Sequence, residues 1–315
     1  MKKKLIMLAS ILLLAGCLIF LQNYESRSFQ MLNTVSEQLA EEIKNTRTQA
    51  SDMDFSCLLC NEMRLPFDSN GKNFYISVDM NTREWEELSF QSGQEGYQLV
   101  FPKDLLQYDK QNYIAAGSGL PVIVYDEAQY AEYTLIFTGL PVIDLTTDVG
   151  IYQENIQGDV VFYDTNFSNH GIMQSKYKAH LRGNTSRMYP KKGYKLNLLK
   201  ATASETLVKN QQSVFGMRTD DDWILYALYN DESKIRDRLS IDIWNAFGAK
   251  SVSDKAVYGT NLTYVELIAD NSYCGLYGLM EPVDAKQLDL STEDYLYKRK
   301  NPHGLRYEEF AKATD

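Results

Sequence analysis

The stretch that decides the fold is SKYKAHLRGNTSRMYPKKGYKLNLL, Ser175–Leu199, which has the pattern of two strands joined by a basic turn. In Ser175–Arg182, basic side chains alternate with apolar or aromatic ones, as in a strand with one buried face. In Gly193–Leu199, Tyr and Leu alternate with Lys and Asn in the same way. The sequence therefore predicts an antiparallel hairpin with a basic outer face, joined by the turn Gly183–Lys192.

The charge of this hairpin is opposite to that of the whole chain. The 315 residues carry 42 acidic and 32 basic side chains, a formal net charge of −10. Residues 166–200, in contrast, contain eight Lys or Arg side chains and no Asp or Glu. A folded surface normally intersperses carboxylates among its cations, so this segment predicts an anionic ligand at the hairpin. The acidic chain as a whole argues against a nucleic acid as the partner.

The turn of the hairpin offers hydrogen-bond donors suited to phosphate. Gly183 permits close backbone approach, Thr185 and Ser186 carry hydroxyl groups, and Arg187 has a planar guanidinium fork. Backbone and side-chain donors that converge in a turn form a concave site for an anion.

Three ordered blocks of the sequence resemble the kinase family of spore-coat protein H (CotH). HLRGNTSRMYPKKGYKLNLL, His180–Leu199, is similar to its Arg-Gly-(Asn/Asp)-x-Ser turn followed by Pro-Lys-Lys-x-Tyr. DDWILYALYNDESKIRDRLSIDIWNAFG, Asp221–Gly248, resembles its Trp-containing strand and the following helix. YVELIADNSYCGLYGLMEPVDAKQL, Tyr264–Leu288, resembles its hairpin ending in Gly-Leu-Tyr-x-Leu-x-Glu. The resemblance extends from about Tyr133 to the C-terminus.

The resemblance implies an atypical protein kinase that uses ATP and Mg²⁺ to phosphorylate a Ser hydroxyl of a protein substrate. Lys195 is then the first candidate for the lysine that bridges the phosphates, and Lys192 the second. Glu281 would lie at the hinge that meets the adenine. The implied ATP-binding residues are Arg182, Gly183, Asn184, Ser186, Arg187, Lys191, Lys192, Lys195 and Glu281.

The sequence departs from the family pattern after Tyr295–Lys298. The family's catalytic and metal-binding Asp residues belong to a later segment with a Trp-Asp-x-Asp motif, and no Trp follows Trp244 here. We therefore assign no catalytic residue and no metal ligand, and expect the chain as given to be inactive, as a fragment or a degenerate family member. The alternative function is an extracytoplasmic module that binds a polyanion or the cell wall, such as teichoic acid or an acidic glycan.

The block Asp221–Gly248 also predicts a helix with one apolar stripe. Asp231 or Ser233 can cap it, and Gly248 ends it. The stripe consists of apolar residues at every fourth position, which we expect to pack against the sheet: Ile235, Leu239, Ile243 and Phe247.

The N-terminus predicts attachment to a bacterial membrane. Lys2–Lys4 precede the apolar run Leu5–Leu21, which is typical of an export signal and is at the lower limit for a bilayer span. The run is either an uncleaved signal anchor or a lipoprotein signal, in which Cys17 becomes the lipidated first residue. The basic flank places the rest of the chain outside the cell.

The expected fold class is α+β. Twenty-two Tyr residues and 12% aromatic residues favour many half-buried strands. We expect a signal anchor or lipoprotein signal over residues 1–22 and a helical stalk over 23–51. A β-rich accessory domain over 52–132 and a kinase-like small lobe, an antiparallel sheet plus a helix, over 133–315 complete the chain. The Cys57–Cys60 pair lacks further ligands for a closed zinc site and predicts buried thiols or a disulfide.

Overall fold

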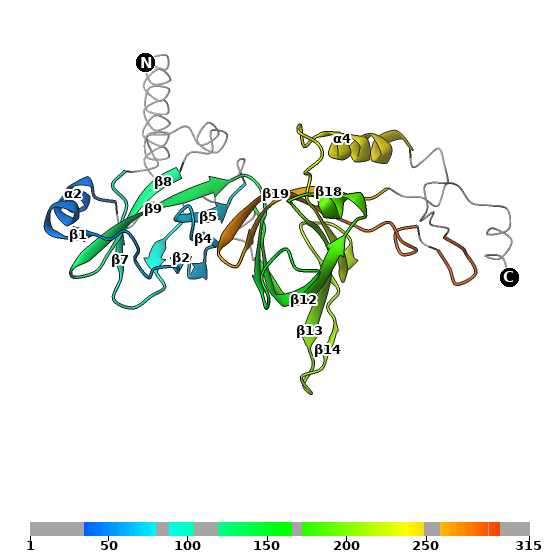
Figure 1. Cartoon of the computed structure of the whole chain (residues 1–315), viewed down its shortest axis with the longest axis horizontal. Coiled ribbons are helices and arrows are strands. Elements are labelled where there is room, and N and C mark those ends of the chain that lie inside the picture. The colour runs from blue at the N-terminus through cyan, green and yellow to red at the C-terminus, as the bar shows by residue number, and fades with distance from the viewer. Residues whose placement is uncertain are drawn as a thin grey trace, which may run out of the picture. The chain divides into compact units, whose positions relative to one another are not determined.

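The computed structural model (Figure 1) describes residues 35–79, 88–103, 119–165, 172–248, 259–288 and 290–296. The chain divides into two units, one of Met1–Tyr229 with Thr263–Leu279 and one of Asn230–Leu262 with Met280–Asp315. Strands dominate the described residues, whose α-helices are α2 (Glu37–Thr46) and α4 (Arg236–Ile243). In this described part, no helix combines the length and the apolarity needed to cross a bilayer.

The N-terminal part of the first unit is a six-stranded sheet with a three-stranded sheet beside it in the sequence. The larger sheet has the order β4-β5-β9-β8-β7, with β1 parallel to β9. Its bounds are β1 Thr48–Gln49, β4 Phe67–Asp68, β5 Asn73–Ser77, β7 Gln98–Val100, β8 Gly119–Tyr125 and β9 Gln129–Thr138. The smaller sheet consists of β2 Leu58–Cys60, β3 Met63–Arg64 and β6 Phe90–Ser92. Cys57 and Cys60 are free thiols.

Helix α2 belongs to this sheet and is not a stalk. The Ser36 hydroxyl accepts a hydrogen bond from the Leu39 N–H at 3.1 Å and caps the helix. Ala40 and Ile43 are 1% and 0% exposed, packed in a cluster with Val100, Ile123, Tyr125 and Tyr130 of the sheet. One face of α2, with Ala40 and Ile43, is therefore buried by the protein itself, and the stalk prediction is wrong. The predicted membrane segment, residues 1–22, lies outside the described residues.

The second part of the first unit is a closed sheet. Seven strands follow one another in the order β12-β11-β10-β18-β19-β17-β13, and β13 pairs with β12 to close the ring, while β14 extends it. The bounds are β10 Val142–Thr147, β11 Asn155–Tyr163, β12 Ile172–Arg182, β13 Gly193–Ala201, β14 Leu207–Lys209, β17 Asp222–Tyr226, β18 Leu262–Ala269 and β19 Ser272–Met280. A short pair, β15 Gln212–Ser213 with β16 Thr219–Asp220, lies between β14 and β17 in the sequence.

This closure corrects the predicted fold class, because an open small-lobe sheet covered by a helix is not what forms. The inner side chains of the seven strands fill the barrel instead, as expected for a ring of this size. Trp223, Tyr177, Tyr194 and Tyr277 are each at most 1% exposed and occupy its interior. The described chain is β-rich, and its sheet needs no covering helix.

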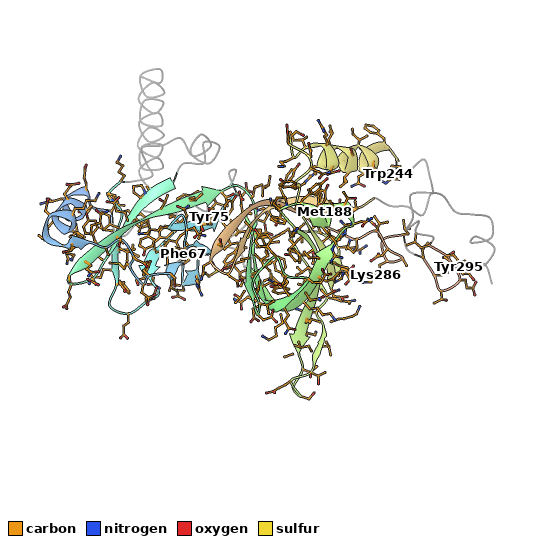
Figure 2. All side chains as sticks on the ribbon, viewed as in Figure 1. Phe67, Tyr75, Met188, Trp244, Lys286 and Tyr295 are labelled. Carbon is orange, nitrogen blue, oxygen red and sulfur yellow. The ribbon has the colours of Figure 1, made fainter. Side chains whose placement is uncertain are left out.

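Contacts between β19 and the N-terminal sheet connect the two parts of the first unit. The ring of Tyr75, labelled in Figure 2 together with Phe67, stacks on Tyr273 with 5.3 Å between the centroids. The Asp68 carboxylate accepts a hydrogen bond from the Tyr273 N–H at 3.2 Å. The Ser69 hydroxyl donates to the Asn271 carbonyl at 2.9 Å.

In the second unit, α4 begins at Arg236, later than the predicted cap at Asp231 or Ser233, and its N-cap residue Ile235 provides no side-chain cap. The Asp231 carboxylate accepts hydrogen bonds from the Ser233 hydroxyl at 2.7 Å and from the Arg236 N–H at 2.9 Å. After Ile243 the helix widens into a π-helical turn, Trp244–Gly248. The predicted burial of the apolar stripe is wrong, because Leu239 is 52% and Phe247 77% exposed.

We predict that Trp223→Ala destabilises the barrel by about 3–5 kcal/mol, because it removes the largest fully buried side chain. Urea denaturation followed by circular dichroism measures the change. Phe247→Ala is the control, since this exposed ring should contribute less than about 0.5 kcal/mol. Equal effects of the two substitutions would contradict the barrel core described above.

Asp144 gives a second prediction, which concerns pH. Burial on β10 raises the pKa of its carboxyl to about 6, which the nearby Arg64 only partly offsets. The ordinary value is 3.8, so the unfolded chain loses this proton first. The folded state therefore loses stability as the pH rises from about 4 through about 6.

Asp144→Asn removes this penalty, so we expect a chain more stable at pH 7 by about 3 kcal/mol and a flatter pH profile between 4 and 6. Urea denaturation at several pH values measures both. Asp159→Asn, a change at an exposed carboxylate on β11, should leave the slope in place. A slope that survives in Asp144→Asn would assign the effect to another group.

Candidate functional site

The predicted basic hairpin is formed by β12 and β13. His180 pairs with Lys195 and Arg182 with Gly193 in an antiparallel register. Along β12, Lys176, Lys178 and His180 are exposed, whereas the residues between them are buried. The predicted alternation of a basic outer face with an apolar inner face is therefore confirmed.

The turn between the strands contains a 3₁₀ helix, Thr185–Met188. Gly183 precedes it with φ +108°, a conformation that side chains with a Cβ rarely adopt. A Cβ at this position would also collide with the Ser186 hydroxyl. Gly183 is thus required both by the backbone and by the space that Ser186 occupies. Met188, labelled in Figure 2, is 81% exposed at the end of the 3₁₀ helix.

Three of the predicted ligand-binding cations hold the turn together. Arg187 forms an ion pair with Glu154. The Lys191 ammonium donates to the Leu276 carbonyl and lies 4.1 Å from the centroid of the Tyr277 ring. Lys192 donates to the carbonyl of Arg187 at 2.6 Å. The structure gives these side chains a role in positioning the turn.

The acids that residues 166–200 lack come from neighbouring strands. Lys176 forms an ion pair with Asp159 of β11 at 3.0 Å, and Lys195 approaches Asp222 of β17 at 3.4 Å. Asn197 donates a hydrogen bond to the same Asp222 carboxylate. The premise that all eight cations lack compensating carboxylates is therefore wrong, because strand pairing brings acids from outside the segment.

Some cations of the hairpin have no such partner. In the part of the chain that the structure describes, no ion pair or side-chain hydrogen bond is formed by Lys178, His180, Arg182 and Lys200. All four are exposed. Of the residues predicted to bind phosphate, Arg182 thus offers a fully available guanidinium beside the turn, and Lys195 an ammonium with one loose partner. Asn184 and Ser186, also predicted, are exposed in the turn.

Glu281 belongs to the second unit, whereas the hairpin belongs to the first. Its side chain is 1% exposed, and its carboxylate accepts a hydrogen bond from the Asn261 amide at 3.0 Å. The Thr260 hydroxyl donates to its backbone carbonyl at 2.5 Å. Glu281 therefore fixes residues 260–261, and its predicted contact with adenine remains a prediction.

A run of acids at the start of β17, Asp220–Asp222, is not part of the predicted site. Asp220 is fully buried beside Arg218, with 2.6 Å between the carboxylate and the guanidinium, and accepts the Asp221 N–H at 2.8 Å. Asp221 is 1% exposed and lies 3.2 Å from the Lys209 ammonium. The signal was three consecutive Asp residues ahead of a buried strand. These contacts indicate that Asp220 and Asp221 anchor the start of β17.

The donors at the hairpin fit a phosphate and not a metal ion. Arg182 and Lys195 only donate, and cations do not ligate Mg²⁺, which prefers carboxylate and other oxygen ligands. Among the described residues, no group of three or more His, Cys, Asp or Glu side chains is arranged to hold a metal. The donor set thus suits an anionic group such as phosphate, and no ligand for Mg²⁺ is assigned.

We predict that Gly183→Ala destabilises the chain by about 1–3 kcal/mol, because it adds backbone strain and displaces Ser186. Thermal denaturation measures the loss. Gly216→Ala is the matched control, since Gly216 also has a positive φ, +72°, but open space around its Cβ position. A second substitution, Ser186→Ala, should recover part of the Gly183→Ala loss; no recovery would contradict the collision.

Comparison with protein-family models matches residues 179–314 to the family described as CotH kinase protein. The match begins in β12, later than the expected Tyr133, and includes the turn and β13. A search of curated proteins finds no match. This match confirms the resemblance seen in the three sequence blocks: residues 179–314 are similar to the CotH kinase protein family.

Proposed function

We propose that this chain takes part in CotH-type protein phosphorylation, with the β12–β13 turn binding the phosphates of ATP and a Ser hydroxyl of a protein as acceptor. The observation that carries the proposal is the family match over the hairpin, combined with the available guanidinium of Arg182 beside Gly183. A planar, permanently charged fork suits the paired oxygens of a phosphate.

Lys195 is the second phosphate ligand in this proposal. Its ammonium is 3.4 Å from the Asp222 carboxylate, longer than the 2.7–2.9 Å of a strong charged hydrogen bond. Asp222 also accepts a hydrogen bond from Asn197, so it can hold the Lys195 side chain near the outer face without saturating it. The turn beside Arg182 and Lys195 is held in its conformation by the contacts of Arg187, Lys191 and Lys192.

We also propose that the apolar run Leu5–Leu21 attaches the chain to the bacterial membrane, as a signal anchor or through a lipidated Cys17, with the bulk outside the cell. Its support is the sequence pattern of basic flank and apolar run. Mass spectrometry of the N-terminal peptide from the native protein distinguishes the two forms of attachment.

Binding of ATP tests the proposed function. We expect calorimetric titration of the folded full chain with ATP to show binding that Arg182→Ala and Lys195→Ala each weaken about tenfold, because each removes a charge-assisted hydrogen bond. Lys200→Ala is the matched control, because it removes the same charge from an exposed position at the far end of β13.

Two results would contradict the nucleotide site. One is the absence of ATP binding by a correctly folded chain. The other is an equal loss in Lys200→Ala together with a steep fall in affinity with salt and no effect of Mg²⁺, which indicates general attraction of a polyanion to the basic face.

A further inference from the structure

The outer face of the barrel contains a hollow that is separate from the turn. It has a volume of about 530 Å³ and is lined mainly by side chains of β11, β12 and β13. This size lies within the range of small-molecule sites. The side chains that matter for its chemistry are Asn155, Gln157, Lys178, His180, Asn197 and Asp148.

Strand register explains why these residues lie together. Asn155 pairs with His180 across β11 and β12, so their side chains are neighbours on the outer face. In the next outer row, Gln157 pairs with Lys178, and Lys178 pairs with Asn197 of β13. Five polar side chains from three adjacent strands therefore face one hollow.

The charges around the hollow divide into satisfied and unsatisfied groups. Asp159 forms an ion pair with Lys176 beyond one edge, and Asp222 approaches Lys195 beyond another while accepting a hydrogen bond from Asn197 of the lining. The one carboxylate in the lining, Asp148, accepts a hydrogen bond from the Gln157 N–H at 3.1 Å.

Lys178 and His180, in contrast, form no ion pair or side-chain hydrogen bond with any described residue. The hollow thus contains a cationic side chain, Lys178, that is available to bind an anionic group of a ligand.

The amides add a second requirement to the ligand. The side chains of Asn155 and Gln157 form no hydrogen bond within the described chain, and each amide can both donate and accept. Asn197 uses its amide nitrogen on Asp222, which leaves its amide oxygen to accept. Groups that donate and accept side by side are suited to hydroxyls, so a bare inorganic anion would leave most of them unused.

We propose that this hollow binds a small ligand that carries an anionic group beside several hydroxyls, such as a sugar phosphate or an acidic sugar. Lys178 and His180 hold the anionic group, and the three amides hold the hydroxyls. The site goes beyond the proposed ATP-binding turn, because neither Arg182 nor Lys195 lines it.

Calorimetric titration of the full chain with glucose 6-phosphate, glucuronate, glucose and inorganic phosphate tests the proposal. We expect the two anionic sugars to bind, and glucose and inorganic phosphate each to bind at least about tenfold more weakly. Lys178→Gln should weaken the binding of the anionic sugars about tenfold. Lys176→Gln, on the same strand and face but paired with Asp159, should change it less than about twofold.

Three outcomes would overturn the proposal. The first is no binding of either anionic sugar, and the second is an equal loss in Lys176→Gln and Lys178→Gln, which indicates general charge attraction. The third is displacement of glucose 6-phosphate by ATP with both ligands lost in Arg182→Ala, which merges the hollow with the nucleotide site. Loss of ATP binding in Arg182→Ala with glucose 6-phosphate binding unchanged supports two independent sites.

Discussion

Pairing of β12 with β13 is the constraint on which the rest of the structure depends. The pairs from Lys176–Leu199 to Arg182–Gly193 join the two ends of the strand order and close the ring. Closure gives every strand an inside and an outside, so large aromatic side chains such as Trp223 fill the interior. The same pairing sets the direction in which every basic side chain of the hairpin points.

Closure also decides which charges remain available for ligands. Because β11 flanks β12 and β17 flanks β13, acids distant in the sequence reach the basic strands from both sides. Asp159 and Asp222 neutralise the edges of the basic face, whereas its middle keeps Lys178 and His180. The functional positive charge is thus smaller and more localised than a count over residues 166–200 indicates.

The sequence was sufficient for features that depend on local pattern. The alternation on both hairpin strands and the glycine turn follow from residue spacing, and the resemblance to the CotH kinase family follows from three motifs. Features that depend on distant partners could not be predicted. Barrel closure and the acids opposite Lys176 and Lys195 arise from strand order, which no local pattern encodes.

The two helices show the same limit. An apolar stripe predicts that a helix has one apolar face, but it does not predict which surface, if any, covers that face. In α2, Ala40 and Ile43 are buried by the adjacent sheet, whereas in α4 the stripe with Leu239 is exposed. The predicted stalk and the predicted packing of α4 were both wrong for this reason.

Lys191 and Lys192 are adjacent lysines in the sequence, yet their ammonium groups contact different parts of the fold. The Lys191 ammonium donates a hydrogen bond to the Leu276 carbonyl and lies over the Tyr277 ring. Both residues belong to β19, a strand that does not pair with the hairpin. This contact connects the turn to β19, and Gly275 on the same strand adopts φ +91°, a conformation that residues with a Cβ rarely adopt. A Cβ at Gly275 would be in ordinary van der Waals contact with the Lys191 ammonium, at 3.5 Å, so the backbone conformation, not a collision with Lys191, favours glycine at this position.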